Sequence, residues 1–160
     1  MNYDYLHEVE TVTFRSEKKR QIAELIPIFE DQSFVVDDDV LRLERTGAIP
    51  PWQPSSIIDV EVLNNGVEMF EFTHGQWDTL QIKYLFAFLP FAFSEQFIQV
   101  IETTSEKLGL TPYFNGGPTN STKLRQTFKE YRDAIFSECG EIPGSESLAI
   151  FIESTYPRKN

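Results

Sequence analysis

The clearest alternation of apolar and polar residues lies between positions 57 and 72. Ile58, Val60 and Val62 alternate with acidic residues, which is typical of a strand with one buried face. Asn64-Asn65-Gly66 follows and predicts a type I′ turn with a return strand over residues 67–72. The run over residues 80–89 predicts a central strand covered on both faces. Shorter apolar runs predict further strands at residues 9–14, 34–36, 40–43, 110–114 and 148–152.

Apolar residues three or four positions apart predict three helices. The first covers residues 17–29, where Pro27 would kink or end it. The second covers residues 94–108, with Ser94 as its N-cap and Gly109 just after its last turn. The third covers residues 121–138, and Asn120 or Ser121 would cap it.

The order of these elements predicts an α+β fold. From residue 57 onward the order is β-β-β-α-β-α-β, which a mixed, largely antiparallel sheet satisfies. We expect the two C-terminal helices to pack mainly on one face, together with an additional N-terminal helix. The 160 residues are the usual length of one domain, so residues 1–160 are expected to form a single globular domain. The proline-rich stretch 48–54 reads as an internal connector.

Acidic residues outnumber basic ones, 25 to 14, and the formal net charge is −11. The segment 24–78 holds twelve acidic residues and only two basic ones, Arg42 and Arg45. Such a field repels nucleic acid and anionic membranes and speeds encounters with basic proteins. Acidity that serves solubility alone is the open alternative.

The segment 24–78 also contains candidate partner-binding residues. The run Asp37, Asp38 and Asp39 predicts an exposed acidic turn between two short strands. Two tryptophans, Trp52 and Trp77, lie in the same segment, and tryptophan is a frequent anchor in protein interfaces. We therefore expect these five residues to contact a basic protein partner.

Several classes of structure receive no support from the sequence. Cys139 is the only cysteine, which excludes an intrachain disulfide and a zinc site built from several cysteines. Residues 1–5 have neither the basic nor the apolar region of a signal peptide, and the apolar run 84–93 is too short to span a membrane. We expect a cytoplasmic protein without a cofactor.

The stretch YFNGGPTNSTK, residues 113–123, is the most suggestive candidate for a small-ligand site. A glycine-containing loop before a helix N-terminus suits an anion. Lys123 and Arg125 lie in the first helical turn, where cations oppose the helix dipole, and an anion would relieve this conflict. The candidate site comprises Asn115, Gly116, Gly117, Lys123 and Arg125.

Two observations weaken this candidate. The spacing matches neither the P-loop nor the dinucleotide-binding motif. A turn followed by a helix cap explains the same composition.

Arg125 also begins a stripe of cations at i, i+4 and i+7 with Lys129 and Arg132.

Other chemistry-bearing residues form no recognisable set. His74 precedes Asp78 and follows Glu68, but the spacing matches no metal motif, and we predict no metal site. Cys139 lies between acidic residues at a helix C-terminus, which raises a thiol pKa and disfavours a nucleophile. No catalytic residue is assigned, and an enzyme is disfavoured without being excluded.

The sequence therefore favours a non-enzymatic, acidic protein-binding domain. One concrete form is an inhibitor of the immunity-protein type, which neutralises a basic protein. The alternative is a small anion-binding protein or enzyme that uses residues 115–125, with His74 as its base.

Overall fold

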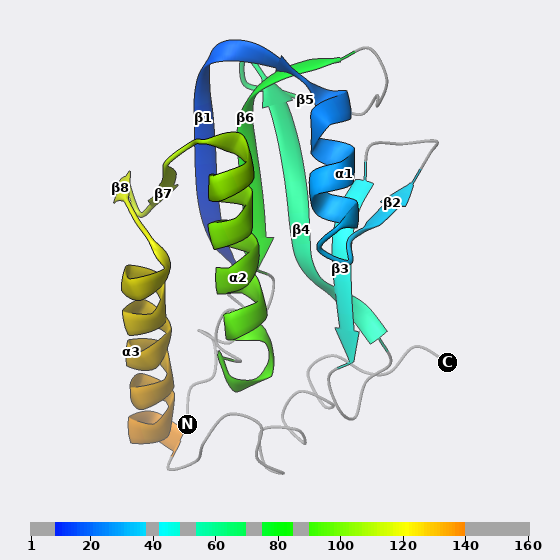
Figure 1. Cartoon of the computed structure of the whole chain (residues 1–160). Helices are drawn as coiled ribbons and strands as arrows, with labels where there is room; N and C mark the ends of the chain where they lie inside the picture. Colours follow the sequence, from blue (N-terminus) through cyan, green and yellow to red (C-terminus); the bar gives the residue numbers. More distant parts are fainter. Residues whose placement is uncertain (1–8, 38–41, 49–53, 70–74, 85–89, 140–160) are drawn as a thin grey trace.

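The computed structural model describes residues 9–37, 42–48, 54–69, 75–84 and 90–139 (Figure 1). These residues form one eight-stranded sheet, three α-helices and a short 3₁₀ turn. In chain order the elements are β1 (Glu10–Gln21), η2 (Ile22–Glu24), α1 (Leu25–Glu30), β2 (Val35–Asp37), β3 (Arg42–Ala48), β4 (Pro54–Asn64), β5 (Val67–Glu68), β6 (Gln76–Tyr84), α2 (Pro90–Leu108), β7 (Pro112–Phe114), β8 (Gly117–Pro118) and α3 (Ser121–Cys139).

The sheet confirms the predicted α+β class and its largely antiparallel character. The strand order is β2-β3-β4-β6-β1-β7-β8, and β5 pairs with β4. Each of these pairings is antiparallel. β6 lies in the centre, between β4 and β1, so the apolar run that begins at Leu80 does enter a central strand.

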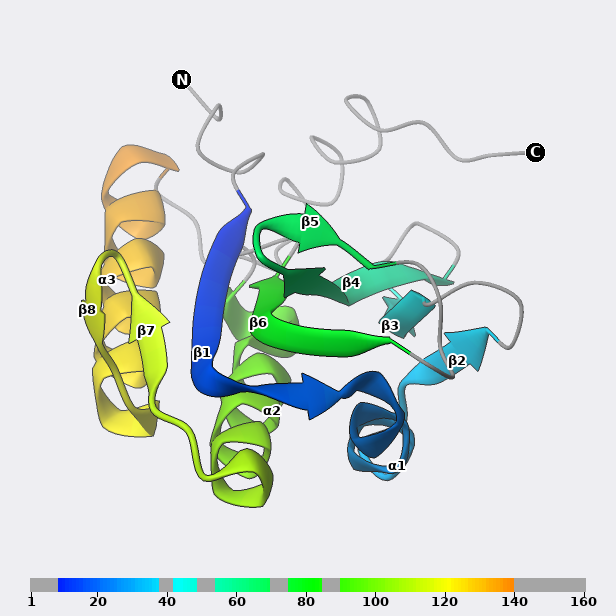
Figure 2. The ribbon, with the colours of Figure 1, turned by 90° about the horizontal axis from the view of Figure 1, so that it is seen from above.

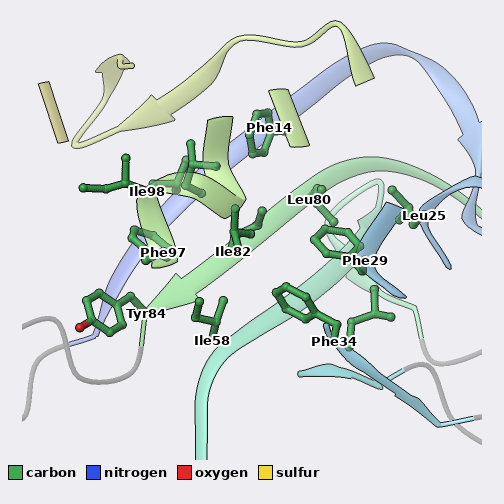
Figure 3. Packing of buried hydrophobic residues seen from close by; sticks show 14 of the residues in the cluster. Phe14, Leu25, Phe29, Phe34, Ile58, Leu80, Ile82, Tyr84, Phe97 and Ile98 are labelled. Atoms are coloured by element: carbon green, nitrogen blue, oxygen red, sulfur yellow. The ribbon is translucent and has the colours of Figure 1, made fainter. Parts of the chain in front are cut away.

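The helices cover one face of this sheet, as predicted for the two C-terminal ones (Figure 2). Leu80, Ile82 and Tyr84 of β6 are fully buried on the helix side. Tyr84 stacks on Phe97 of α2 with ring centroids 5.2 Å apart, and Phe128 of α3 lies 5.6 Å from the same ring. Burying each such side chain stabilises the fold by about 1.5–3 kcal/mol. Figure 3 shows this packing between the sheet and the helices.

The N-terminal helix is much shorter than predicted. The strand β1 continues to Gln21, and the α-helix covers only Leu25–Glu30 after the 3₁₀ turn. The periodic positions Ile22, Leu25 and Phe29 are buried, but the residues before them continue strand β1 instead of forming a helical turn. Arg20 and Gln21 pair with β6, and residues 16–19 form a bulge. Pro27 fits because it lies in the first turn of α1, where no intrahelical partner for its missing N–H is needed.

The second helix begins earlier than predicted, at Pro90. Ser94 is therefore a buried residue within α2 and not its N-cap. Proline suits the first position of a helix because its fixed φ matches helical geometry. The predicted end is right, since Gly109 follows Leu108 with φ +67° and its N–H donates to the Ser105 carbonyl over 2.9 Å.

Two tight turns form hairpins. Asn65 and Gly66 have φ values of 50° and 79°, which confirms the predicted type I′ turn between β4 and β5. Asn115 and Gly116 have φ values of 52° and 81° and join β7 to β8 in the same way. This second hairpin explains the composition of Asn115, Gly116 and Gly117 in the candidate anion site.

The proline-rich connector joins two paired strands. Ala48 at the end of β3 lies opposite Pro54 at the start of β4. The strands on either side of the connector therefore belong to the same sheet. Residues 49–53 and the strand predicted at 148–152 lie outside the described residues.

Candidate functional site

Acidic side chains gather on the face of the sheet that no described helix covers. Ile58 and Val62 of β4 are buried on the helix side, so the alternate residues Asp59 and Glu61 point to the other face. Register partners share a face, which adds residues from the neighbouring strands. We call this set the acidic face: Asp37, Glu44, Asp59, Glu61 and Glu68.

Basic residues compensate this charge only in part. Lys83 of β6 forms an ion pair with Glu61 over 2.7 Å, and the two side chains are 34% and 23% exposed. Arg42 lies opposite Asp37 in the β2–β3 ladder. The Ser56 hydroxyl donates a hydrogen bond to the Asp59 carboxylate. Five acidic residues thus share this face with two basic ones across the five strands β2 to β6.

Crowding of carboxyl groups is strongest at Glu68. Its pKa is raised, first by partial loss of solvent, then by the charge of Glu61 and a hydrogen bond between the two carboxyl groups. Lys83 acts in the opposite direction and lowers this pKa, but the raising effects prevail. An added cation near Glu61 and Glu68 would therefore lower the electrostatic free energy of this face.

The adjoining corner of the sheet holds a large β-bulge. Arg15 lies opposite Thr79 and Arg20 lies opposite Trp77, so residues 16–19 project beyond Asp78. The Lys19 ammonium reaches across to Asp78 and to the hairpin residues Asn64 and Asn65. The hydrogen bond from Lys19 lowers the pKa of Asp78, as does the Asn65 N–H over 3.1 Å. These contacts tie β1 to the hairpin that carries Glu68.

The predicted partner-binding residues have different placements. Trp77 is fully buried, and its Nε1–H donates to the Gln21 carbonyl over 3.3 Å. In this position its ring is part of the core and offers no surface to a partner. Asp37 ends β2 at the edge of the acidic face. Asp38, Asp39 and Trp52 lie outside the described residues.

The predicted anion site is divided between two structures. Asn115, Gly116 and Gly117 form the β7–β8 hairpin, and Asn120 caps α3 by accepting from the Lys123 N–H over 2.9 Å. Arg125 is bound by Glu95 of α2, with its Nε 2.9 Å and its Nη2 3.3 Å from the two carboxylate oxygens. Glu95 thus supplies, from within the chain, the anion that the sequence indicated at Arg125.

The described residues contain no recognisable catalytic or metal-binding group. Among them, no three histidine, cysteine, aspartate or glutamate side chains gather closely enough to hold a metal ion. Cys139 is the last residue of α3, and His74 lies outside the described residues. In the same part of the chain, no helix combines the length and apolarity needed to cross a membrane.

Four residues of the acidic face were not among the partner-binding residues predicted from the sequence: Glu44, Asp59, Glu61 and Glu68. The sequence feature that could have identified some of them is the alternation of acidic residues with buried aliphatic residues in β4. That alternation places Asp59 and Glu61 on one face, but the contribution of Glu44 and Glu68 depends on strand register.

No protein-family model matches the chain, and no curated protein is similar to it.

Proposed function

We propose that this protein is a non-enzymatic binding domain that takes a basic protein on its acidic face. The observation that carries the proposal is the gathering of Glu44, Asp59, Glu61 and Glu68 on the face left open by the described helices. Isolated surface acids are common, but these four lie on three adjacent strands of one rigid sheet.

Electrostatics on this face favour a cationic partner. The pKa of Glu68 is raised first by partial loss of solvent and then by the charge of Glu61, and a partner ammonium or guanidinium group would relieve the repulsion between these two carboxyl groups. Complementary charge mainly accelerates association and selects against acidic partners. Val35, which lies opposite Glu44, is 55% exposed and adds an apolar contact beside the acids.

An inhibitor of the immunity-protein type is the concrete form of this function that we propose. Such a protein needs no active site, because it acts by covering a basic surface of its target. The net charge of −11 supports rapid capture of such a target at low ionic strength. Asp37, at the end of β2, belongs to the same face.

Affinity capture from the native host tests the proposal. The tagged protein is incubated with lysate at about 50 mM salt, where exposed charges interact over about 10 Å or more, and bound proteins are identified by mass spectrometry. We expect the captured protein to be basic. Its rate of association with this protein should fall at least about tenfold when the salt concentration is raised above this level. An acidic-face variant, Glu44→Gln with Asp59→Asn and Glu61→Gln, should capture much less of it.

A matched variant separates the acidic face from total charge. Glu17, Glu102 and Glu106 are exposed acids outside the acidic face, and changing all three to glutamine alters the net charge equally. This control should capture the partner as the wild type does. Equal losses in both variants, or no loss in the acidic-face variant, would contradict the proposal.

A further inference from the structure

A groove with a cavity volume of about 530 Å³ lies beside the bulge of β1. One wall comes from residues 15–20 of β1, and the other comes from residues 109–111 and Tyr113. Strand pairing brings the two walls together, because Phe14 of β1 lies opposite Pro112 of β7. Figure 2 shows β7 alongside β1, close to the point where β1 bends. None of the five residues of the acidic face lines this groove, so the two surfaces are distinct.

The β1 wall of the groove is rich in cations. Four of its six residues are basic: Arg15, Lys18, Lys19 and Arg20. Glu17 is the one acidic residue that lines the groove in the described part of the chain. The bulge creates this concentration, because it places residues 16–19 opposite the single residue Asp78. Positive charge is thus gathered at one place in a chain whose net charge is −11.

Two of these cations are held by other groups of the chain. The Lys19 ammonium forms an ion pair with Asp78. The Arg20 guanidinium lies 5.8 Å from the centre of the Trp77 ring, and its Nη1 lies 3.8 Å from a carboxylate oxygen of Glu24. These contacts engage both side chains, so neither is counted as a ligand-binding group.

The other two cations, Arg15 and Lys18, are available to a ligand. Both are exposed, and neither side chain forms an ion pair, a hydrogen bond or a ring contact within the part of the chain that the structure describes. Glu17 is exposed and unpaired as well, and the three groups together still carry a net positive charge. Arginine binds phosphate oxygens through its planar fork of N–H groups, and lysine binds them as a compact charge. This wall therefore suits a phosphate group.

The opposite wall offers an exposed aromatic ring. Tyr113 is 42% exposed, and its ring has no aromatic or cationic neighbour among the described residues. Tyr113 lies opposite Thr13, so Arg15 is its diagonal neighbour on the same face of the sheet. Diagonal neighbours are about 7–8 Å apart, a distance that long side chains span. Thr111 is also exposed and adds a hydroxyl to this wall.

We propose that this groove binds a small phosphate monoester that carries a flat ring, the chemistry of a nucleoside monophosphate. The phosphate lies between Arg15 and Lys18, and the ring stacks on the exposed side of Tyr113. Aromatic side chains stack on nucleobases with little preference among them, because every base has a π-face. The volume of the groove lies within the range of about 300–1,000 Å³ that is usual for small-molecule sites.

Charge and stacking act together in this assignment. Inorganic phosphate would use the two cations but leave Tyr113 uncovered, while a neutral nucleoside would use Tyr113 alone. A long nucleic acid would bring many phosphates toward a chain of net charge −11, so a ligand with a single phosphate is favoured. This inference does not rest on the proposed protein-binding function, and either can fail without the other.

Titration of the ¹⁵N-labelled protein with adenosine 5′-monophosphate, followed by amide chemical shifts, tests the inference. We expect shifts confined to residues 15–20 and 109–113, with a Kd on the order of 1 mM, as suits a small ligand in an open groove. Adenosine keeps the ring without the phosphate, and ribose 5-phosphate keeps the phosphate without the ring. Each should bind at least about tenfold more weakly than adenosine 5′-monophosphate.

Variants of the two walls complete the experiment. Arg15→Gln combined with Lys18→Gln should weaken binding of adenosine 5′-monophosphate at least about tenfold, and Tyr113→Val at least about fivefold, while circular dichroism reports an intact fold. Lys123→Gln combined with Lys129→Gln changes the net charge equally on exposed residues outside the groove, and it should leave the Kd unchanged.

The inference would be overturned by several results. Adenosine or ribose 5-phosphate that bound as tightly as adenosine 5′-monophosphate would show that the ring and the phosphate are not both recognised. Shifts centred outside the groove would place the ligand elsewhere. An unchanged Kd in the Arg15 and Lys18 double variant, or an equal loss in the Lys123 and Lys129 control, would show that the groove cations do not hold the phosphate.

Discussion

Replacing Gly66 with alanine should destabilise the protein, whereas the same change at Gly117 should not. Gly66 has φ +79°, in the left-handed region, and Gly117 has no such constraint. A Cβ atom added at either position would meet no atom within 4 Å. The two substitutions therefore differ in backbone conformation and not in steric contact with neighbouring groups.

The expected magnitudes follow from this difference. A left-handed conformation costs an alanine about 1–2 kcal/mol. The unfolded chain loses freedom in both variants, which stabilises each by about 0.4–1 kcal/mol. Gly66→Ala should then be less stable than wild type by up to about 1.5 kcal/mol, and Gly117→Ala more stable by about 0.4–1 kcal/mol. The gap between the two variants isolates the left-handed cost, about 1–2 kcal/mol.

Urea unfolding followed by circular dichroism measures the gap. The midpoints should differ while the denaturant slopes stay equal, because neither change alters the surface exposed on unfolding. In thermal unfolding each 1 kcal/mol corresponds to about 2–4 °C for a chain of this length. Gly116→Ala, at φ +81° in the other hairpin, should behave like Gly66→Ala. A gap below about 0.5 kcal/mol would refute the turn assignment at Gly66.

Three further changes test the core and the charged contacts. Trp77→Phe should cost about 1.5–3 kcal/mol in urea unfolding, through lost packing and the lost bond to the Gln21 carbonyl, and it should leave the association rate with a captured partner unchanged. A slower association rate without loss of stability would instead indicate that Trp77 contacts the partner. Asp78→Asn should lower the free energy of unfolding by about 0.5–1 kcal/mol at pH 7. Lys19 lowers the pKa of Asp78, so the stability that this carboxylate contributes is present above the unfolded pKa near 3.8. It is lost as pH falls through the lower folded pKa. Thermal unfolding from pH 7 to pH 2 should therefore show the two proteins converging in acid, and a constant difference would contradict this. Partial loss of solvent and the charge of Glu61 raise the pKa of Glu68, so its ionisation costs stability as pH rises from its ordinary pKa of 4.5 through the folded pKa. Glu68→Gln should be more stable than wild type at pH 7 by up to about 0.5 kcal/mol, with the gain absent below about pH 4 in the same thermal series, and a gain that persists in acid would rule out this origin.

The sequence predicted the elements best where local chemistry decides them. The type I′ turn at Asn65-Gly66 follows from two residues that tolerate positive φ, and the C-terminus of α2 follows from Gly109. The helices α2 and α3 follow from apolar periodicity, although α2 begins earlier than its apparent cap. Local signals of this kind do not depend on the rest of the fold.

The sequence failed where pairing between distant strands decides the structure. Residues 17–21 were predicted to begin a helix, yet they belong to strand β1, where pairing of Arg20 and Gln21 with β6 keeps the chain extended and residues 16–19 form a bulge. Trp77 was a candidate anchor for a partner, but its position in a central strand places it in the core. The acidic face needed strand register, which a single sequence does not supply.

The central position of β1 has a consequence for the timing of synthesis. Glu10 pairs with Tyr84, so the first strand waits for a partner roughly 70 residues further along the chain. At about 5–20 residues per second, that interval is roughly 4–14 s on the ribosome. During it, β1 is an unpaired strand, and such strands are prone to aggregate. The charged bulge residues Glu17, Lys18 and Lys19 lie within this strand, and charges at such positions disfavour pairing with other nascent chains.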